Sequence, residues 1–551
     1  MRRWGPLVVL AAAQFLMVLD QAVMNVSISQ LVADFDTTVT TIQGVITLYS
    51  LVMAMFMLTG GKLGDLLGRR RAFTIGLIVY GLGSAMTALA PTTWVLALGW
   101  SVLEGLGAAL VLPALAALVA GNYVDTDRRV AYAVIGGVAG AGIAVGPIVG
   151  GWATTELSWR VVFVGEVVVV LGILAAMGLL TDAPGPERPP RLDGVGAALS
   201  ALGLGAIVYA ILQASIWGWL SPKDSPIEPF GFALTPFVVA GGGVVLWLFV
   251  RWQRHRERAG ADPLVHIDLF GVVPLRAGLQ SMLAQNLILM GVFFTIPLYL
   301  QLVLGFDALE TGVRMLPVSI AMFLASIGGS SLATRLPVRT IVRAGLVAIT
   351  LAALVLLWTI QPNLRGLGFA TGMALLGLGM GLIASQVGNV VQSSVDASGR
   401  SEAGGLQYTA QQLGSAVGVA LIGAIVISAL ASNFVHRIDE NEAIPDEVAA
   451  DVRVAIDGNT TFLATDQVET AAREAGLDDA VVEPLVDDYG DAQLAALKVG
   501  LLVSGAIALG ALLTTGGLPS RRPDEPTAED EPPSVTPPGA AERIDPTIQD
   551  L

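Results

Sequence analysis

Carboxylates inside long apolar runs are the residues of this chain best suited to chemistry. Asp20, Glu104 and Glu166 each lie in such a run. A charged side chain within a bilayer is costly, so an acid in that position normally faces a cavity or a partner and serves a function. Burial disfavours the ionised form of a carboxyl group, and a cavity that opens alternately to each side lets the group bind and release a proton. We expect Asp20 and Glu104 to be proton sites, with Asp20 the principal one.

Each acid also has a simpler interpretation. Neighbouring polar groups could hold Asp20 permanently in one state. Glu166 stands near the outer boundary of its run, six residues after Arg160. It is either a third titrating group or the ion-pair partner of Arg160, and the sequence alone favours the ion pair.

Composition indicates a membrane protein. The 551 residues are 54% hydrophobic and only 14% charged, and the mean hydropathy is +0.71; such values are typical of a polytopic membrane protein. With no cysteine and three histidines the chain offers neither a disulfide nor a thiolate or histidine cluster for a metal. No phosphate-binding loop or nucleophile motif supports an enzyme, and we expect no cofactor and no metal.

The net charge of -15 belongs to two segments. Residues 432–494 hold 16 acids against 3 arginines, and residues 518–551 hold 8 acids against 3 arginines. The rest of the chain is close to neutral, so the acidity does not describe the membrane body. No nucleic-acid partner is indicated.

Apolar runs of about 20 residues, the length that a helix needs to cross a bilayer, predict fourteen spans. They lie near 6–28, 43–63, 72–90, 94–119, 131–153, 160–181, 194–216, 230–251, 276–301, 312–333, 340–360, 366–391, 404–430 and 495–517. Basic residues then gather on one side, at Arg69 to Arg71, Arg128, Arg129, Arg188, Arg191, Arg251, Arg254, Arg256, Arg258, Arg335, Arg339, Arg521 and Arg522. Because Lys and Arg accumulate on the cytoplasmic side, we expect a multi-pass protein of the cell membrane with both termini in the cytoplasm. Arg160 and Arg365 are single exceptions.

These spans divide the chain into repeated parts, as in many transporters. We expect an all-α polytopic fold arranged as six spans, two additional spans and six more. The parts are 1–181, 182–251, a basic cytoplasmic linker at 252–275, and 276–517. An acidic extracytoplasmic loop at 432–494 carries two or three short amphipathic helices, and the tail at 518–551 is disordered.

A glycine-rich basic string, Gly60 to Arg71, joins the second and third spans. It closely resembles motif A of the major facilitator superfamily, with matches at Gly61, Asp65, Gly68, Arg69 and Arg70. The resemblance implies a gating role for the loop and the major facilitator fold for the chain. Leu66 replaces a usual basic residue, and the string could also be no more than a positive-inside anchor.

Three further strings resemble motifs of that superfamily. In the first span, the pattern around Gln14, Asp20 and Asn25 is similar to that of the fourteen-span drug:proton antiporters and places Asp20 and Asn25 on its key positions. The fifth span resembles motif C, typical of exporters, at Gly142, Gly146, Pro147, Gly150 and Gly151. The fourth span resembles the end of motif B, but Ser101 and Glu104 replace its usual Arg and Gln, so a cation is lost and an acid is gained.

Polar and aromatic residues in the spans are candidates for a substrate cavity. They are Asn25, Tyr49, Trp100, Gln285, Asn286, Tyr299, Gln386, Asn389, Gln407 and Gln411. Aromatic rings beside acids suit amphipathic, cationic organic molecules. The amides fit equally well as hydrogen bonds between helices.

We therefore expect an alternating-access, proton-coupled exporter of amphipathic, cationic small molecules, acting as a monomer in the lipid bilayer. The alternatives are export of an endogenous metabolite or lipid, uniport without protons, and a membrane scaffold or receptor that transports nothing.

Overall fold

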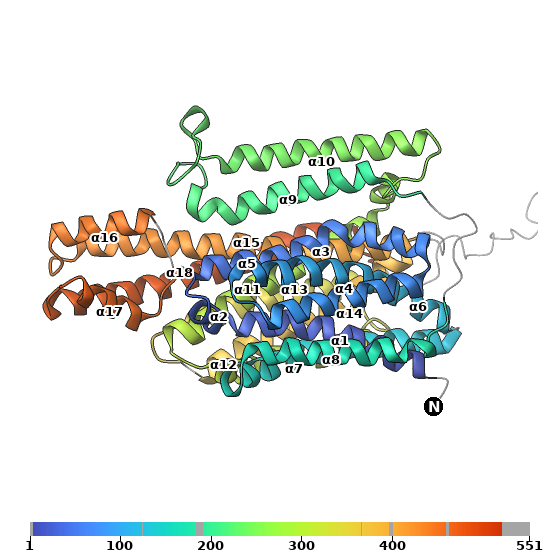
Figure 1. The fold of residues 1–551 in the computed structure, drawn as a ribbon, viewed down its shortest axis with the longest axis horizontal. Helices are drawn as coiled ribbons and strands as arrows, with labels where there is room; N and C mark the ends of the chain where they lie inside the picture. Colours follow the sequence, from blue (N-terminus) through green and yellow to red (C-terminus); the bar gives the residue numbers. More distant parts are fainter. Residues whose placement is uncertain are drawn as a thin grey trace, which may run out of the picture.

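The computed structural model describes residues 4–123, 125–182, 191–364, 366–395, 400–458 and 462–520, and within these ranges every regular element is a helix. Most of the helices run side by side along one axis of the molecule (Figure 1). Of the tail expected to be disordered at 518–551, residues 521–551 lie outside the described residues, as do Arg188 and Arg365. The basic residues Arg521 and Arg522 belong to that part of the tail.

Fourteen long helices correspond one to one with the fourteen expected spans. They are α1 (Gly5–Val26), α3 (Val39–Leu67), α4 (Arg69–Ala88), α6 (Gly105–Asn122), α7 (Asp125–Glu156), α8 (Trp159–Ala175), α9 (Gly194–Trp217), α10 (Thr235–Arg258), α11 (Val273–Leu298), α12 (Ala308–Leu332), α13 (Val338–Thr359), α14 (Gly366–Ser393), α15 (Arg400–Glu440) and α18 (Asp479–Thr514). Among the described residues, thirteen spans are long and apolar enough to cross a bilayer, and α7 occupies the place of the fifth expected one. The expected all-helical membrane architecture is confirmed.

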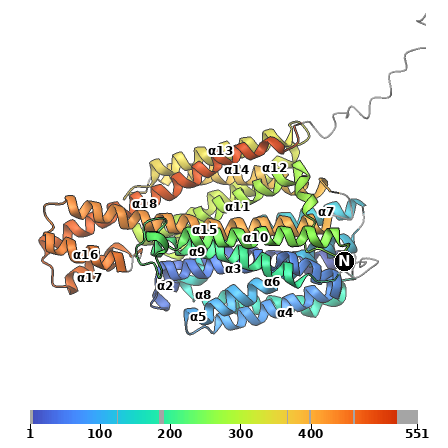
Figure 2. The same ribbon diagram turned by 90° about the horizontal axis from the view of Figure 1, so that it is seen from above.

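The helices form two packed halves. In the first half α1 packs on α7, and α4 and α3 pack on α6; in the second, α12 and α13 pack on α14, and α11 packs on α15. Two long contacts join the halves, one between α3 and α15 and the other between α7 and α12. Figure 2 shows α12, α13 and α14 at the edge of the molecule opposite α4 and α8.

The helices α9 and α10 form a hairpin beside the two halves (Figure 1). The first of them contacts α3 and α15, whereas α10 packs mainly on α9. Asp193 closes the base of the hairpin, because its carboxylate accepts hydrogen bonds from Trp252 Nε1 and Gln253 Nε2. Because α9 contacts one helix of each half, the hairpin lies across the line where the halves meet.

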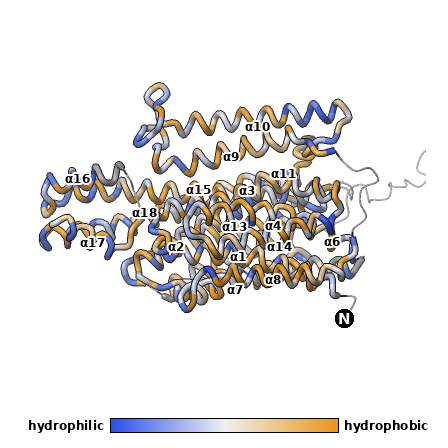
Figure 3. The backbone as a smooth tube through the Cα atoms, viewed as in Figure 1, coloured by the Kyte–Doolittle hydropathy of each residue, from blue (hydrophilic) through white to orange (hydrophobic). Residues whose placement is uncertain are grey.

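Beyond the bundle, α15 and α18 continue together into a projecting head, which also holds α16 (Asp446–Gly458) and α17 (Thr465–Glu474). The head is hydrophilic along α16 and α17 (Figure 3), and it lies at the end of the molecule opposite the N-terminus. Two amphipathic helices thus fall in the acidic segment. Since α15 runs to Glu440 and α18 starts at Asp479, the connection between these helices is shorter than the expected 432–494 loop.

Candidate functional site

Three buried carboxylates meet inside the first half. Asp20 comes from α1, Glu104 from the π-helix η1 (Ala97–Glu104) and Glu166 from α8. One carboxylate oxygen from each residue lies within 4.8 Å of the corresponding oxygens of the other two. The side chains are almost completely buried, at 0%, 0% and 2% exposure. We call these three residues the acid triad.

Local helix geometry brings Glu104 into the triad. The fourth span starts as α5 (Thr93–Leu96), widens into η1 and returns to α-helix at Gly105. Single π-turns of this kind occur often at functional sites, because they change the direction of the side chains that follow. Gly83 of α4 and Gly99 of η1 let the two helices touch: a methyl group at Gly83 would overlap with the Gly99 carbonyl oxygen and with Glu104.

Neutral donors hold one oxygen of each acid. Trp100 Nε1 donates to Asp20 Oδ1 at 2.7 Å. Tyr80 and Ser84 donate to Glu166 Oε2 at 3.2 and 2.9 Å. The Thr87 hydroxyl lies 3.3 Å from Glu104 Oε1, but it also lies 2.9 Å from the Gly83 carbonyl oxygen.

The donors on α4 were not among the residues expected from the sequence. Tyr80, Ser84 and Thr87 are spaced four and three residues apart, so they lie on one face of α4. Hydroxyl residues at helical spacing inside an apolar run are visible in the sequence, and this pattern could have identified the donors.

The second oxygen of each acid is buried without a partner. Within the described part of the chain, Asp20 Oδ2, Glu104 Oε2 and Glu166 Oε1 accept no hydrogen bond, and the Tyr49 hydroxyl is likewise buried without a partner. The Tyr49 ring stacks on Trp100 with centroids 4.5 Å apart. Two like charges 4.8 Å apart repel by about 3.5 kcal/mol at an effective dielectric constant near 20. Simultaneous ionisation of the triad is therefore strongly disfavoured.

Arg160 does not pair with Glu166, and that expectation was wrong. Arg160 Nη1 contacts Asp34 Oδ2 at 3.1 Å, and Nη2 donates to the Ala90 carbonyl oxygen. Partial burial opposes ionisation of Asp34, but hydrogen bonds from Gln30, Trp159 and Arg160 outweigh it and hold the pKa of Asp34 below its usual value. Since α8 carries Glu166 inward from Arg160, Glu166 is an interior acid and not a boundary one.

The glycines of the motif C string make two helix contacts. Gly142, Gly146 and Gly150 face α1, where an added methyl group would press on Val18, Ala22 and Val23 respectively. On the side that faces the other half, α7 contacts α12 through two glycines. A methyl group at Gly151 of α7 would overlap with the Ala308 carbonyl oxygen, and a methyl group at Gly312 of α12 would overlap with the Pro147 carbonyl oxygen. Small residues allow this close approach of backbones, so α7 joins α1 and α12 tightly.

Hydrogen bonds between the halves cluster toward the end that carries the head. Gln301 Nε2 donates to the Val26 carbonyl oxygen at 2.8 Å, and Ser29 donates to Gln301 Oε1. Gln43 Nε2 donates to the Val419 carbonyl oxygen at 2.9 Å. The Leu309 amide donates to the Thr155 hydroxyl at 3.2 Å. These bonds hold the halves together at that end.

The loop of motif A lies at the opposite end. Asp65 forms an ion pair with Arg69, one turn away. Gly68 caps α3 with a φ of 92°, which favours glycine. The Arg70 amide donates to Asp182 Oδ1 at 3.0 Å. The motif residues thus connect α3, α4 and the segment after α8, and Gly61 lies beside Pro113 of α6.

The expected cavity residues separate into two groups. Gln285, Tyr299 and Gln386 donate to backbone carbonyl oxygens of Met380, Gln361 and Gly329 respectively, so they bind helix to helix within the second half.

The others are placed differently. Tyr49 and Trp100 cover the acid triad, and Asn25 donates to the Gln21 carbonyl oxygen. Asn286 donates to the Met282 carbonyl oxygen. Asn389 is exposed, and Gln407 and Gln411 are half-buried.

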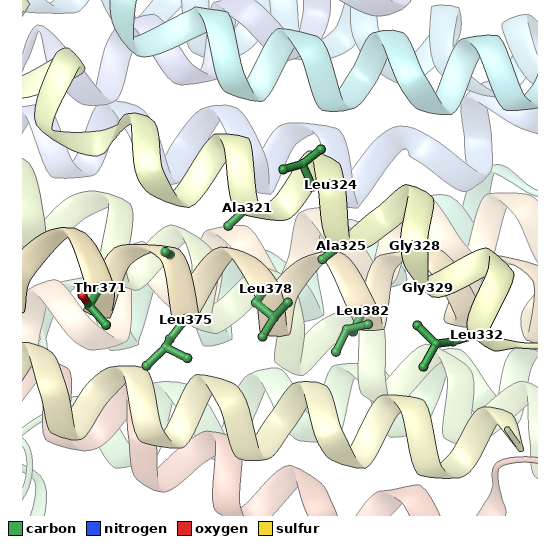
Figure 4. Close-up of a pocket in the computed structure, with 11 residues that line it drawn as sticks. Ala321, Leu324, Ala325, Gly328, Gly329, Leu332, Thr371, Leu375, Leu378 and Leu382 are labelled. Carbon is green, nitrogen blue, oxygen red and sulfur yellow. The ribbon is translucent and has the colours of Figure 1, made fainter.

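A surface pocket of about 540 Å³ lies between α12 and α14. Figure 4 shows it lined by small and aliphatic side chains, including Leu324, Leu378 and Leu382. It holds no charged residue and none of the triad, so it is separate from the candidate site.

Two packed helical halves, one of which encloses buried carboxylates, are typical of a polytopic membrane transporter. Residues 10–419 match the family model of the Major Facilitator Superfamily. The chain belongs to this superfamily and is a transporter, not an enzyme.

Relatives of known name are similar along most of their length. The tetracenomycin C resistance and export protein of Streptomyces glaucescens is 28% identical over 542 residues, which cover 96% of this chain and 94% of the relative. The multidrug efflux pump LfrA of Mycolicibacterium smegmatis is 29% identical, with 92% and 96% covered. The puromycin resistance protein pur8 of Streptomyces alboniger is 33% identical, with 83% and 88% covered.

Solved structures share the fold. A bacterial homolog of the human lysosomal transporter Spinster, inward-facing and unoccupied, has a TM-score of 0.56 at 14% identity and covers 93% of this chain and 98% of its own. A peptide transporter in complex with sulfate has a TM-score of 0.56 at 16% identity, with 94% and 96% covered.

Proposed function

We propose that this protein exports amphipathic small molecules by alternating access, driven by inward flow of protons. The observation that carries the proposal is the acid triad, in which Asp20 is fully buried and hydrogen-bonded to Trp100. An acid that is costly to ionise when sealed and easy to ionise when hydrated can couple proton binding to a change of conformation.

The export direction is supported by motif C and by the relatives. The three relatives described above carry export, efflux or resistance in their names. Close packing of α7 on both α1 and α12 supplies the joint between the halves. Export of an antibiotic-like compound therefore fits better than uptake.

The substrate class follows from charge. Among the described residues no Lys, Arg or His bonds to the acid triad, so the first half can accept a cationic molecule but would repel an anion. A cationic substrate near the triad favours its ionised form, and proton binding then favours release of the substrate. The Tyr49 ring stacks on Trp100, which donates to Asp20, so we propose that the substrate binds against this pair of rings.

The orientation belongs to the proposal as well. Basic clusters at Arg69 to Arg71 and Arg251 to Arg258 lie at the ends of helices remote from the acidic head. By the positive-inside tendency, both termini and the 252–275 linker are cytoplasmic, and the head is extracytoplasmic.

Flux in proteoliposomes tests the function. The purified full-length chain is reconstituted, a pH gradient is imposed, and uptake of tetraphenylphosphonium and of puromycin is followed together with the internal pH. We expect accumulation against a concentration gradient, with movement of protons in the opposite direction. Transport that ignores the pH gradient would support the uniporter, and a protein that moves none of a broad panel of amphipathic compounds would support the scaffold.

A further inference from the structure

The acid triad has an arrangement of free oxygens that single-site proton coupling does not require. Each acid uses one oxygen to accept a hydrogen bond from the protein and leaves its second oxygen buried and unpaired. Buried polar atoms normally have partners, and an unpaired one calls for an explanation. One explanation accounts for all three free oxygens. Protons bound to them would form hydrogen bonds between the acids.

Among the described residues, the groups that donate hydrogen bonds to the triad are all neutral. These groups are Tyr80, Ser84 and Thr87 of α4, and Trp100 of η1, and Tyr49 of α3 adds a neutral ring that stacks on Trp100. Among the described residues no cation forms an ion pair with the three acids. Arg160, the nearest arginine in sequence to Glu166, is engaged by Asp34. Protons bound to the carboxyl groups can therefore balance the charge of the triad while it is sealed.

Hydrogen-bond counting indicates how many protons the triad needs. With two protons, two acids donate through their free oxygens to the third, and all three free oxygens gain a partner. With one proton, two neighbouring acids remain ionised and repel each other in a buried site. The Thr87 hydroxyl oxygen lies 2.9 Å from the Gly83 carbonyl oxygen and 3.3 Å from Glu104 Oε1. Thr87 therefore stabilises an ionised Glu104 only weakly, which favours a protonated Glu104 with the proton on its free Oε2.

We propose that Asp20, Glu104 and Glu166 act as one proton-sharing unit that holds two protons when sealed and exchanges both in each transport cycle. Glu166 is thus a working member of the unit and not a structural acid. The inference rests on the proposed proton coupling, and it specifies how many protons are exchanged in each transport cycle. Two protons entering for each monovalent cation exported carry a net charge, so transport responds to membrane potential as well as to the pH gradient.

Infrared difference spectroscopy counts the protons without any substrate. The full-length protein in proteoliposomes is taken through a pH jump, and the C=O stretching band of protonated carboxyl groups is measured against a carboxylic-acid standard. We expect the wild-type band to correspond to two protonated acids and Glu166→Gln to halve it. Glu310→Gln, an exposed acid at the start of α12, is the matched control and should leave the band unchanged.

Either a wild-type band for one acid or an unchanged band in Glu166→Gln overturns the proton-sharing unit. The flux assay then tests the stoichiometry with tetraphenylphosphonium, from the membrane potential that cancels a known pH gradient. A ratio of two protons per cation supports the proposal, and a ratio of one overturns it while leaving proton coupling intact. A complete lack of response to the pH gradient overturns proton coupling itself, and the infrared result still decides whether the acids share protons.

Discussion

Trp100 holds Asp20 by a hydrogen bond of 2.7 Å from its indole Nε1, and the same indole ring stacks on Tyr49. The carboxylate and the ring therefore cannot move independently. A change in the charge of Asp20 alters the hydrogen bond that positions the ring, and a molecule that displaces the ring removes the donor from Asp20. In the proposed mechanism, this pair links proton binding at Asp20 to the shape of the inner surface of the first half.

Asp20→Asn tests the principal proton site. Asparagine keeps the shape and can still accept from Trp100, but it cannot bind or release a proton. We expect proton-driven accumulation to be abolished while exchange of substrate across the membrane persists. Glu104→Gln, measured in the same proteoliposomes, should do less damage because it restores the residue that is usual at this position of motif B. Undiminished accumulation in Asp20→Asn would exclude Asp20 as the principal site.

Trp100→Phe and Tyr49→Phe form a matched pair that separates the hydrogen bond from the stacked rings. Each variant keeps an aromatic ring in the stack. Trp100→Phe leaves Asp20 without its donor, and we expect a loss of about 1–3 kcal/mol of stability together with slower transport. Tyr49→Phe removes a hydroxyl that is already buried and unpaired, so it should be neutral or slightly stabilising. Thermal unfolding in detergent measures both; equal destabilisation would mean that the hydrogen bond contributes little.

Asp65→Asn tests the gate at the motif A loop. The change removes the charge that pairs with Arg69, at the end of α3 remote from the hydrogen bonds that join the halves. Turnover should fall while equilibrium affinity for substrate stays roughly the same, because the loop is far from the acid triad. Binding of a labelled substrate and its flux are measured on the same preparation. A parallel collapse of binding would contradict the gating role.

Gly151→Ala tests the joint between the halves. The added methyl group would overlap with the Ala308 carbonyl oxygen of α12, and overpacking of this kind costs about 1–3 kcal/mol. We expect lower thermal stability and faster labelling of a cysteine placed at Ser29. Gly137→Ala on the same helix has open space around it and serves as the control. Equal thermal stability and equal labelling rates in the two variants would show that the contact between α7 and α12 accommodates the added methyl group.

Single cysteines in this cysteine-free chain test the orientation. A membrane-impermeant thiol reagent should label Asp466→Cys in the head on intact cells, whereas Arg258→Cys at the end of α10 should be labelled only after lysis. The reverse pattern would invert the proposed topology.

Much of the architecture was predictable because lipid imposes a simple rule on sequence. Apolar runs of sufficient length must be helices, so the fourteen spans follow from composition and correspond to helices of similar bounds. The short helix α2 (Ile28–Asp34) after the break at Ser27 was not expected, since the first expected span ends near residue 28 and the residues that follow are partly polar.

The site was only partly predictable, because its geometry depends on contacts between helices far apart in sequence. Asp20 and Glu104 were found from the cost of an acid in a bilayer. The sequence leaves Glu166 as either a third titrating group or the partner of Arg160, its neighbour along one helix, whereas the partners of Glu166 come from α4. The π-turn in η1, which directs Glu104 toward the triad, has no recognisable sequence signature here.

Because α15 is one continuous helix, movement of the second half is transmitted to the acidic head. This single helix spans 41 residues, about 60 Å at 1.5 Å per residue, and it runs from the contact with α3 to the outermost part of the molecule. Arg437 of α15 pairs with Asp491 of α18 at 2.9 Å, so the two helices carry α16 and α17 as a stiff arm. Any rocking of the second half is therefore amplified at the tip of the arm. A fluorophore pair or an antibody fragment attached there would report each conformational cycle from outside the membrane, at a distance from both the substrate and the protons.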